Sequence, residues 1–147
     1  MQAYLQQIFD YNYHCNRKII EACSAMEAVP ENIQKRFSHI LNAHHIWNAR
    51  ILEQPREFEV WQVHEVPRWQ ELHYQNQRDS FEVISQASDL GRRVTYENTE
   101  GRSFSNSLQD ILFHIVNHST HHRGQISVDF RTHGLEPLSL DYIHYKR

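Results

Sequence analysis

Histidines at helical spacing are the feature of this sequence that most directly suggests chemistry. The chain has 12 histidines in 147 residues, and His114, His118, His121 and His122 lie close together. His118 and His122 are four residues apart, so on a helix their imidazoles project from one face, one turn apart. Two such nitrogens can reach one metal ion at about 2.0–2.1 Å. The pair therefore predicts part of a metal site.

The spacing by itself is a weak signal. Random placement of this many histidines would give about one such pair, and His114 with His118 makes a second. The position of the pair adds to the signal. His118 and His122 continue the apolar line of Ile111 and Ile115, so they are expected to face the interior of a bundle. A neutral imidazole that is buried there needs hydrogen-bonding or metal partners. The alternative is that these histidines are hydrogen-bonded in the core or at a solvated helix edge.

A third ligand is expected from another helix, because two histidines rarely hold a catalytic ion alone. Residues 30–54 offer His39, His44 and His45. Helical periodicity places His39 toward one edge of the apolar face and favours His44, which lies on the line of Phe37, Ile40, Trp47 and Ile51. The local pattern leaves this choice open.

Long helices must position these side chains. Apolar residues at helical spacing predict helices over residues 2–26, 30–54 and 65–88, each followed by a proline or glycine that favours a helix end. A fourth helix is expected to begin after a cap at Ser105 or Ser107 and to end at Gly134.

Between the third and fourth helices, residues 93–96 and 102–104 flank the turn-forming segment 98–101 and predict a small β-hairpin. The tail from Glu136 onward is expected to pack back on the helices. The expected fold class is all-α: an antiparallel up-and-down four-helix bundle with a small hairpin before the last long helix, in a single domain over residues 1–147.

Charge and composition exclude several classes of protein. The net charge of −3 and the pI near 6.4 argue against a nucleic-acid-binding protein, and no apolar run is long enough to span a membrane. The beginning of the chain lacks the features of a signal peptide. Cys15 and Cys23 would lie about 12 Å apart along one helix, too far for a disulfide. A cytoplasmic protein is expected.

Several motifs resemble the DinB superfamily over nearly the whole chain. The most specific segment is Asn117-His118-Ser119-Thr120-His121-His122-Arg123-Gly124-Gln125-Ile126, and Ser38 to Trp47, followed by Arg50, resembles the second-helix motif. Shorter matches are Asp10-Tyr11-Asn12 with Asn16-Arg17, then Tyr96 to Gly101, and Asp141-Tyr142-Ile143.

The resemblance implies that one divalent ion is held by His39, His118 and His122. It favours His39 over His44, which stays the alternative ligand. Three neutral imidazoles suit zinc or nickel and leave a position open, where the ion could lower the pKa of a water or hold a thiolate.

Members of the superfamily include S-transferases for low-molecular-weight thiols and a mycothiol-dependent maleylpyruvate isomerase. The predicted function is therefore a metal-dependent enzyme with a possible low-molecular-weight thiol cosubstrate. The alternative is a non-enzymatic, stress-related metal-binding bundle. The resemblance also implies a homodimer.

Residues beside the predicted ligands have two interpretations each. Asn117 and Gln125 could orient ligands or form an ordinary polar face. His114 and His121 could orient the ligands or act as general bases, but solvent-facing or capping roles are favoured. Arg123 could meet an anionic substrate, but a salt bridge to one of the 18 acidic residues is favoured. Gly124 suggests a close approach to another helix, within the bundle or across a dimer. Trp47, Trp61 and Trp69 could wall a pocket, although core or interface positions are commoner.

Overall fold

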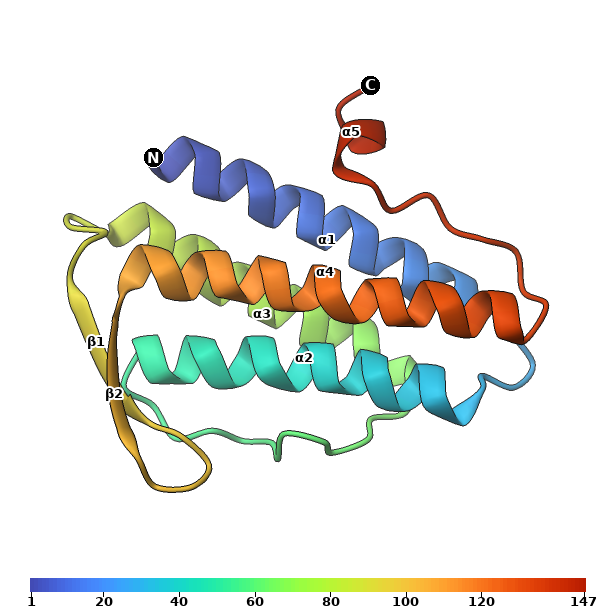
Figure 1. The fold of residues 1–147 in the computed structure, drawn as a ribbon, viewed down its shortest axis with the longest axis horizontal. Helices are drawn as coiled ribbons and strands as arrows, with labels where there is room; N and C mark the ends of the chain where they lie inside the picture. Colours follow the sequence, from blue (N-terminus) through green and yellow to red (C-terminus); the bar gives the residue numbers. More distant parts are fainter.

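Four long helices lie side by side along the molecule, with a small hairpin across one end (Figure 1). The computed structural model describes all residues, 1–147. The helices are α1 (Gln2–Ser24), α2 (Glu31–Ile51), α3 (Val66–Gln86), α4 (Leu108–Thr132) and the short α5 (Tyr142–Tyr145). The prediction of a mostly helical protein with one hairpin is confirmed, but the helices number five rather than four.

The hairpin joins α3 to α4. Strands β1 (Arg93–Glu97) and β2 (Ser103–Ser107) pair antiparallel, with Arg93 opposite Ser107 and Glu97 opposite Ser103. Both strands are longer than predicted. Residues Asn98 to Arg102 form the turn, in which Gly101 has a φ of 77°, a conformation that costs glycine little.

The helix ends follow local chemistry. Ser107 caps α4, because its side chain accepts a hydrogen bond from the Asp110 amide, whereas the alternative cap, Ser105, lies within β2. Gly134, with a φ of 68°, follows α4 as predicted. The second helix ends at Ile51 rather than near 54, where Glu53 adopts a positive φ of 55°.

The core consists of two apolar clusters with a polar zone between them. The cluster near the hairpin includes Leu5, Phe9, Ile84, Leu108 and Leu112. The cluster at the other end includes Ile19, Ile33, Phe37, Trp69, Ile126 and Phe130. Between them, at mid-length, the long helices bury polar side chains, among them Asn12, Asn16, His44, Asn48, His73, Ser80 and Arg123. On α4 this zone lies between Val116 and Ile126 and includes His118 and His122.

The tail packs against α1, as predicted. The Tyr11 hydroxyl donates to the Leu140 carbonyl at 2.7 Å, and the Lys18 ammonium donates to the Ser139 carbonyl at 3.0 Å. None of the helices combines the length and the apolar character that crossing a membrane would need.

Candidate metal centre

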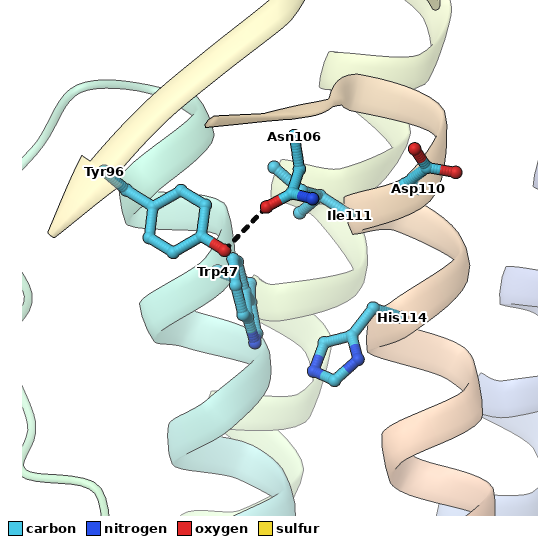
Figure 2. A pocket seen from close by; sticks show the side chains of 6 residues that line it. All are labelled: Trp47, Tyr96, Asn106, Asp110, Ile111 and His114. Carbon is cyan, nitrogen blue, oxygen red and sulfur yellow. Dashed lines mark hydrogen bonds between the residues drawn. The ribbon is translucent and has the colours of Figure 1, made fainter. Parts of the chain in front are cut away.

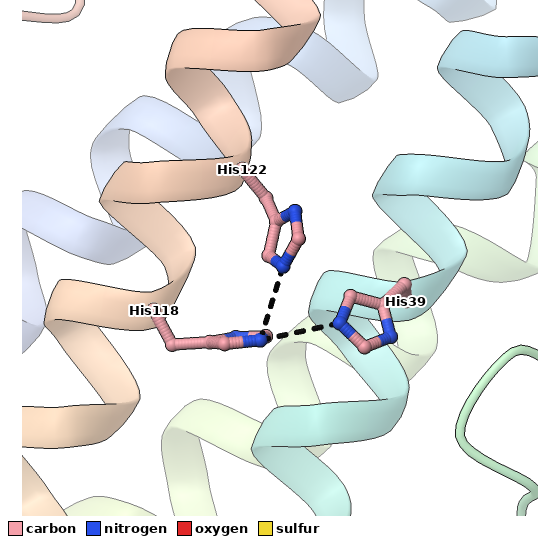
Figure 3. Close-up of side chains that lie close together, drawn as sticks. All are labelled: His39, His118 and His122. Carbon is pink, nitrogen blue, oxygen red and sulfur yellow. Dashed lines mark hydrogen bonds between the residues drawn. The ribbon is translucent and has the colours of Figure 1, made fainter.

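Three imidazoles converge between α2 and α4 (Figure 3). His39 comes from α2, and His118 and His122 come from successive turns of α4. The Nε2 atom of His118 lies 3.2 Å from Nε2 of His39 and 3.1 Å from Nε2 of His122. The three potential ligand atoms all lie within 4.8 Å of one another, so they could hold a metal ion.

The outer nitrogens of two rings fix which tautomer each ring adopts. The Nδ1 atom of His39 lies 3.0 Å from the Val60 carbonyl oxygen, which can only accept, so Nδ1 donates and Nε2 carries a lone pair. The Nδ1 atom of His122 lies 2.7 Å from Oε1 of Gln125. Arg36 donates to the same Oε1 at 3.1 Å, which fixes the orientation of that amide, so His122 is also protonated at Nδ1.

These tautomers leave the centre of the cluster electron-rich. Two lone pairs, on His39 and His122, point at Nε2 of His118, which can donate at most one hydrogen. At least one lone pair therefore has no donor among the three rings, and a cation bound there would satisfy it. Ligand nitrogens at about 2.05 Å from a tetrahedral ion lie about 3.3 Å apart. The two short separations in this cluster are close to that value.

Burial keeps the three rings neutral, which is the state that binds a metal. Burial, together with the neighbouring imidazoles, lowers the pKa of His118 to about 3. Burial also lowers the pKa of His39, against an opposing effect of the Val60 carbonyl. The pKa of His122 is lowered by burial as well, although its hydrogen bond to Gln125 opposes this.

The loop between α2 and α3 completes the cluster. The Trp61 indole stacks on the His39 ring, with centroids 3.8 Å apart and planes 11° apart. The Val60 carbonyl that orients His39 comes from the same loop. Neither contact has a sequence signal, because residues of an irregular loop lie at no fixed spacing from a helix face.

His44, the alternative third ligand, is held elsewhere. Its ring is buried, and its Nε2 lies 2.8 Å from the Ser80 hydroxyl of α3, which in turn donates to Asn48 at 2.9 Å. Periodicity identified a buried position correctly, but α2 has two buried sides. His44 faces α3 and His39 faces α4. The neighbouring His45 accepts a hydrogen bond from the Glu57 amide at 2.9 Å.

The residues beside the cluster play different parts. Gln125 contacts a cluster histidine, whereas Asn117 is exposed. His121 is exposed and packs its ring against that of His122, with centroids 5.0 Å apart. His114 is also exposed, and its ring centroid lies 5.6 Å from that of His118. Trp69 is a core residue.

One expectation on α4 is wrong, and a second fails within the single chain. Arg123 forms no salt bridge: it is buried, and its guanidinium donates to Asn12, to Asn16 at 2.9 Å and to Thr120 at 2.9 Å. The acidic side chains are mostly at the surface, while neutral amides occupy the polar zone. No close approach occurs at Gly124 within the chain, because a Cβ there would meet no atom within 4 Å.

Comparison with known protein families gives a match over the whole chain. The model of the DinB family matches residues 1–147. No curated protein matches the chain. The family match spans both helices that supply the histidines and the hairpin between them. The chain belongs to the DinB family.

Proposed function

We propose that this protein is a metal-dependent enzyme in which His39, His118 and His122 hold one divalent ion. The observation that carries the proposal is the convergence of three Nε2 atoms, two of them deprotonated because Val60 and Gln125 engage the opposite ring nitrogens. The all-nitrogen donor set suits zinc or nickel. In this proposal the four long helices act as the antiparallel bundle that holds the site.

Three protein ligands correspond to a catalytic rather than a closed structural site. An ion bound there would supply Lewis acidity, which can keep the thiolate of a low-molecular-weight thiol stable at neutral pH or lower the pKa of water. Gln125 and Val60 orient the imidazoles, and Trp61 covers one face of His39. We propose that a thiol is the cosubstrate and that its sulfur forms a bond to an electrophilic carbon of a second substrate, while the thiol proton is lost and the leaving group on that carbon departs.

Cobalt(II) substitution tests this proposal, because the absorption of cobalt reports its ligands. We expect the wild type to bind one cobalt ion per chain and its absorption to change when a thiol is added. Both the binding and the absorption change should be lost in His122→Ala and kept in the exposed control Asn117→Leu. Turnover of the thiol with an electrophile should then saturate. A bound metal that neither responds to thiols nor supports turnover would favour the non-enzymatic, metal-binding alternative.

We further propose that two copies pair through the exposed side of α4. Phe113 and Val128 are more than half exposed there, and the open space at Gly124 between them leaves room for a partner. Sedimentation should give a dimer for the wild type and a monomer for Phe113→Glu. A monomeric wild type at high concentration would contradict this pairing.

A further inference from the structure

A cavity of about 340 Å³ lies between α2, α3 and the first part of the loop that joins these two helices. Its apolar surface is formed by Leu41 of α2, Phe58 of the loop and Leu72 of α3. None of the three histidines of the metal centre lines it. The cavity is therefore separate from the metal centre, which lies on the side of α2 that faces α4.

Two carboxylates line this cavity without a compensating cation. Glu57 and Asp79 belong to none of the ion pairs of the chain, and no lysine or arginine is among the lining residues. Burial lowers the pKa of His45, which also lines the cavity, while Glu57 and Asp79 act in the opposite direction. The imidazole is therefore neutral at pH 7, and both carboxylates lie near it.

A buried amide adds an oxygen beside one of these carboxylates. Asn76 is 3% exposed, and its Nδ2 donates to the Leu41 carbonyl at 3.0 Å, whereas no group of the chain donates to its Oδ1. This oxygen is not among the unpartnered atoms that are sealed from solvent, and Asn76 lines the cavity, so Oδ1 opens into it. Asn76 and Asp79 are three residues apart on α3, so their side chains are neighbours.

The positions of these groups argue against a metal ion as the ligand. The nitrogens of His45 and the carboxylate oxygens of Glu57 and Asp79 do not come within 4.8 Å of one another as those of the metal centre do. The Nε2 atom of His45 already accepts from the Glu57 amide at 2.9 Å. An ammonium group needs only one carboxylate and a nearby oxygen, and its carbon chain can cover an apolar wall.

The pocket of about 230 Å³ beside the hairpin offers no such charge (Figure 2). Its one carboxylate, that of Asp110, accepts from Ser107 in the cap of α4 and points away from the Trp47 and Tyr96 rings. In the cavity between α2 and α3, by contrast, Oδ1 of Asp79 accepts from Gln75 at 2.8 Å and Oδ2 has no partner.

We propose that the cavity between α2 and α3 binds a free primary alkylamine, with its ammonium at Asp79 and Oδ1 of Asn76 and its carbon chain against the apolar wall. A cavity of about 150 Å³ holds benzene, so this one admits a chain of about five carbons with its ammonium. The exposed carboxylate of Glu57 adds to the attraction. Binding requires no metal, so the inference stands beside the proposed function.

Nuclear magnetic resonance titration with pentylamine, pentanol, pentanoate and methylamine tests the proposal. The backbone amide signal of Glu57 and the side-chain amide signal of Asn76 should shift with pentylamine, while the indole signal of Trp47 stays in place. We expect pentanol and pentanoate to bind at least about tenfold more weakly, because they lack the charge-assisted contact. Methylamine should also bind at least about tenfold more weakly, because it lacks the chain.

Two variants of α3 test the contact with the ammonium. Asp79→Asn should bind pentylamine about tenfold more weakly than the wild type, with its affinity for pentanol unchanged. Glu82→Gln is the matched control, because Glu82 accepts from Gln86 as Asp79 accepts from Gln75 but does not line the cavity. Its affinity for pentylamine should equal that of the wild type.

The outcomes separate this inference from the proposed function. Pentanoate or methylamine binding as tightly as pentylamine, or an unchanged affinity in Asp79→Asn, would overturn the assignment of the cavity. In His122→Ala the affinity for pentylamine should be kept, even where that variant has lost its metal. Loss of binding there, with shifts at Trp61 in the wild type, would place the amine at the metal centre and contradict the inference.

Discussion

Replacing Gln125 should weaken metal binding without removing a ligand. Its Oε1 accepts from Nδ1 of His122 at 2.7 Å and from Arg36 at 3.1 Å, and Arg36 also pairs with Asp129 at 2.8 Å. This chain of contacts from Asp129 to His122 holds the imidazole in the tautomer that presents a lone pair on Nε2. Gln125→Leu keeps the approximate size of the side chain and removes the acceptor.

The size of the effect follows from that single hydrogen bond. Loss of an outer partner of a metal-ligating histidine lowers metal affinity about 10- to 100-fold, which corresponds to about 1.4–2.7 kcal/mol. Gln125→Glu keeps the acceptor and should retain most of the affinity. Asn117→Leu is the matched control, because Asn117 lies on the same helix and is exposed.

Competition with a chromophoric zinc chelator measures these affinities directly. We expect the wild type, Asn117→Leu and Gln125→Glu to have similar zinc affinities. The zinc affinity of Gln125→Leu should be well below theirs. An affinity of Gln125→Leu equal to that of the wild type would refute the reasoning, because His122 would then need no orientation by its outer nitrogen.

Three further predictions concern stability. Burial lowers the pKa of His44 to about 3 and that of His73 to about 4, so below an unfolded pKa of about 6.5 only the unfolded chain binds these protons. The free energy of unfolding should therefore fall as the pH drops from 6.5, by about 2 kcal/mol per histidine at pH 5. In denaturant titrations, the free energy of unfolding of His44→Asn should depend less steeply on pH. Arg123→Met should destabilise the protein by about 3 kcal/mol in the same assay, because it leaves the side-chain oxygens of two buried asparagines of α1 unpaired; an unchanged midpoint would contradict this. Gly134→Ala should lower the free energy of unfolding by about 1–2 kcal/mol, because φ is 68° there, and a stabilised variant would disprove the assignment of strain.

The helices could be predicted because their signals are local. Apolar spacing located each long helix, and Ser107, Pro67 and Gly134 mark ends that depend only on nearby backbone groups. α2 ends about three residues before its predicted end, and the sequence does not signal this because no strong helix breaker precedes Pro55. The short helix α5 has too few residues to show a periodic pattern.

The candidate site shows where local pattern stops being informative. Periodicity reports that a residue is buried but not which neighbouring helix it faces, so it favoured His44, which contacts Ser80 instead. The family resemblance pointed to His39, which the structure brings to the α4 pair. The Trp61 stack depends on the path of a loop, which spacing along the chain does not encode.

Elemental analysis of the purified, dialysed protein tests the central claim most directly. The wild type should carry about one zinc or nickel ion per chain. His44→Ala should carry the same amount, because the His44 ring contacts Ser80 of α3 and not the metal site. His39→Ala and His122→Ala should lose the ion with the helical circular dichroism signal kept. A full complement of metal in His122→Ala, or loss of metal in His44→Ala alone, would contradict the assignment of the metal centre.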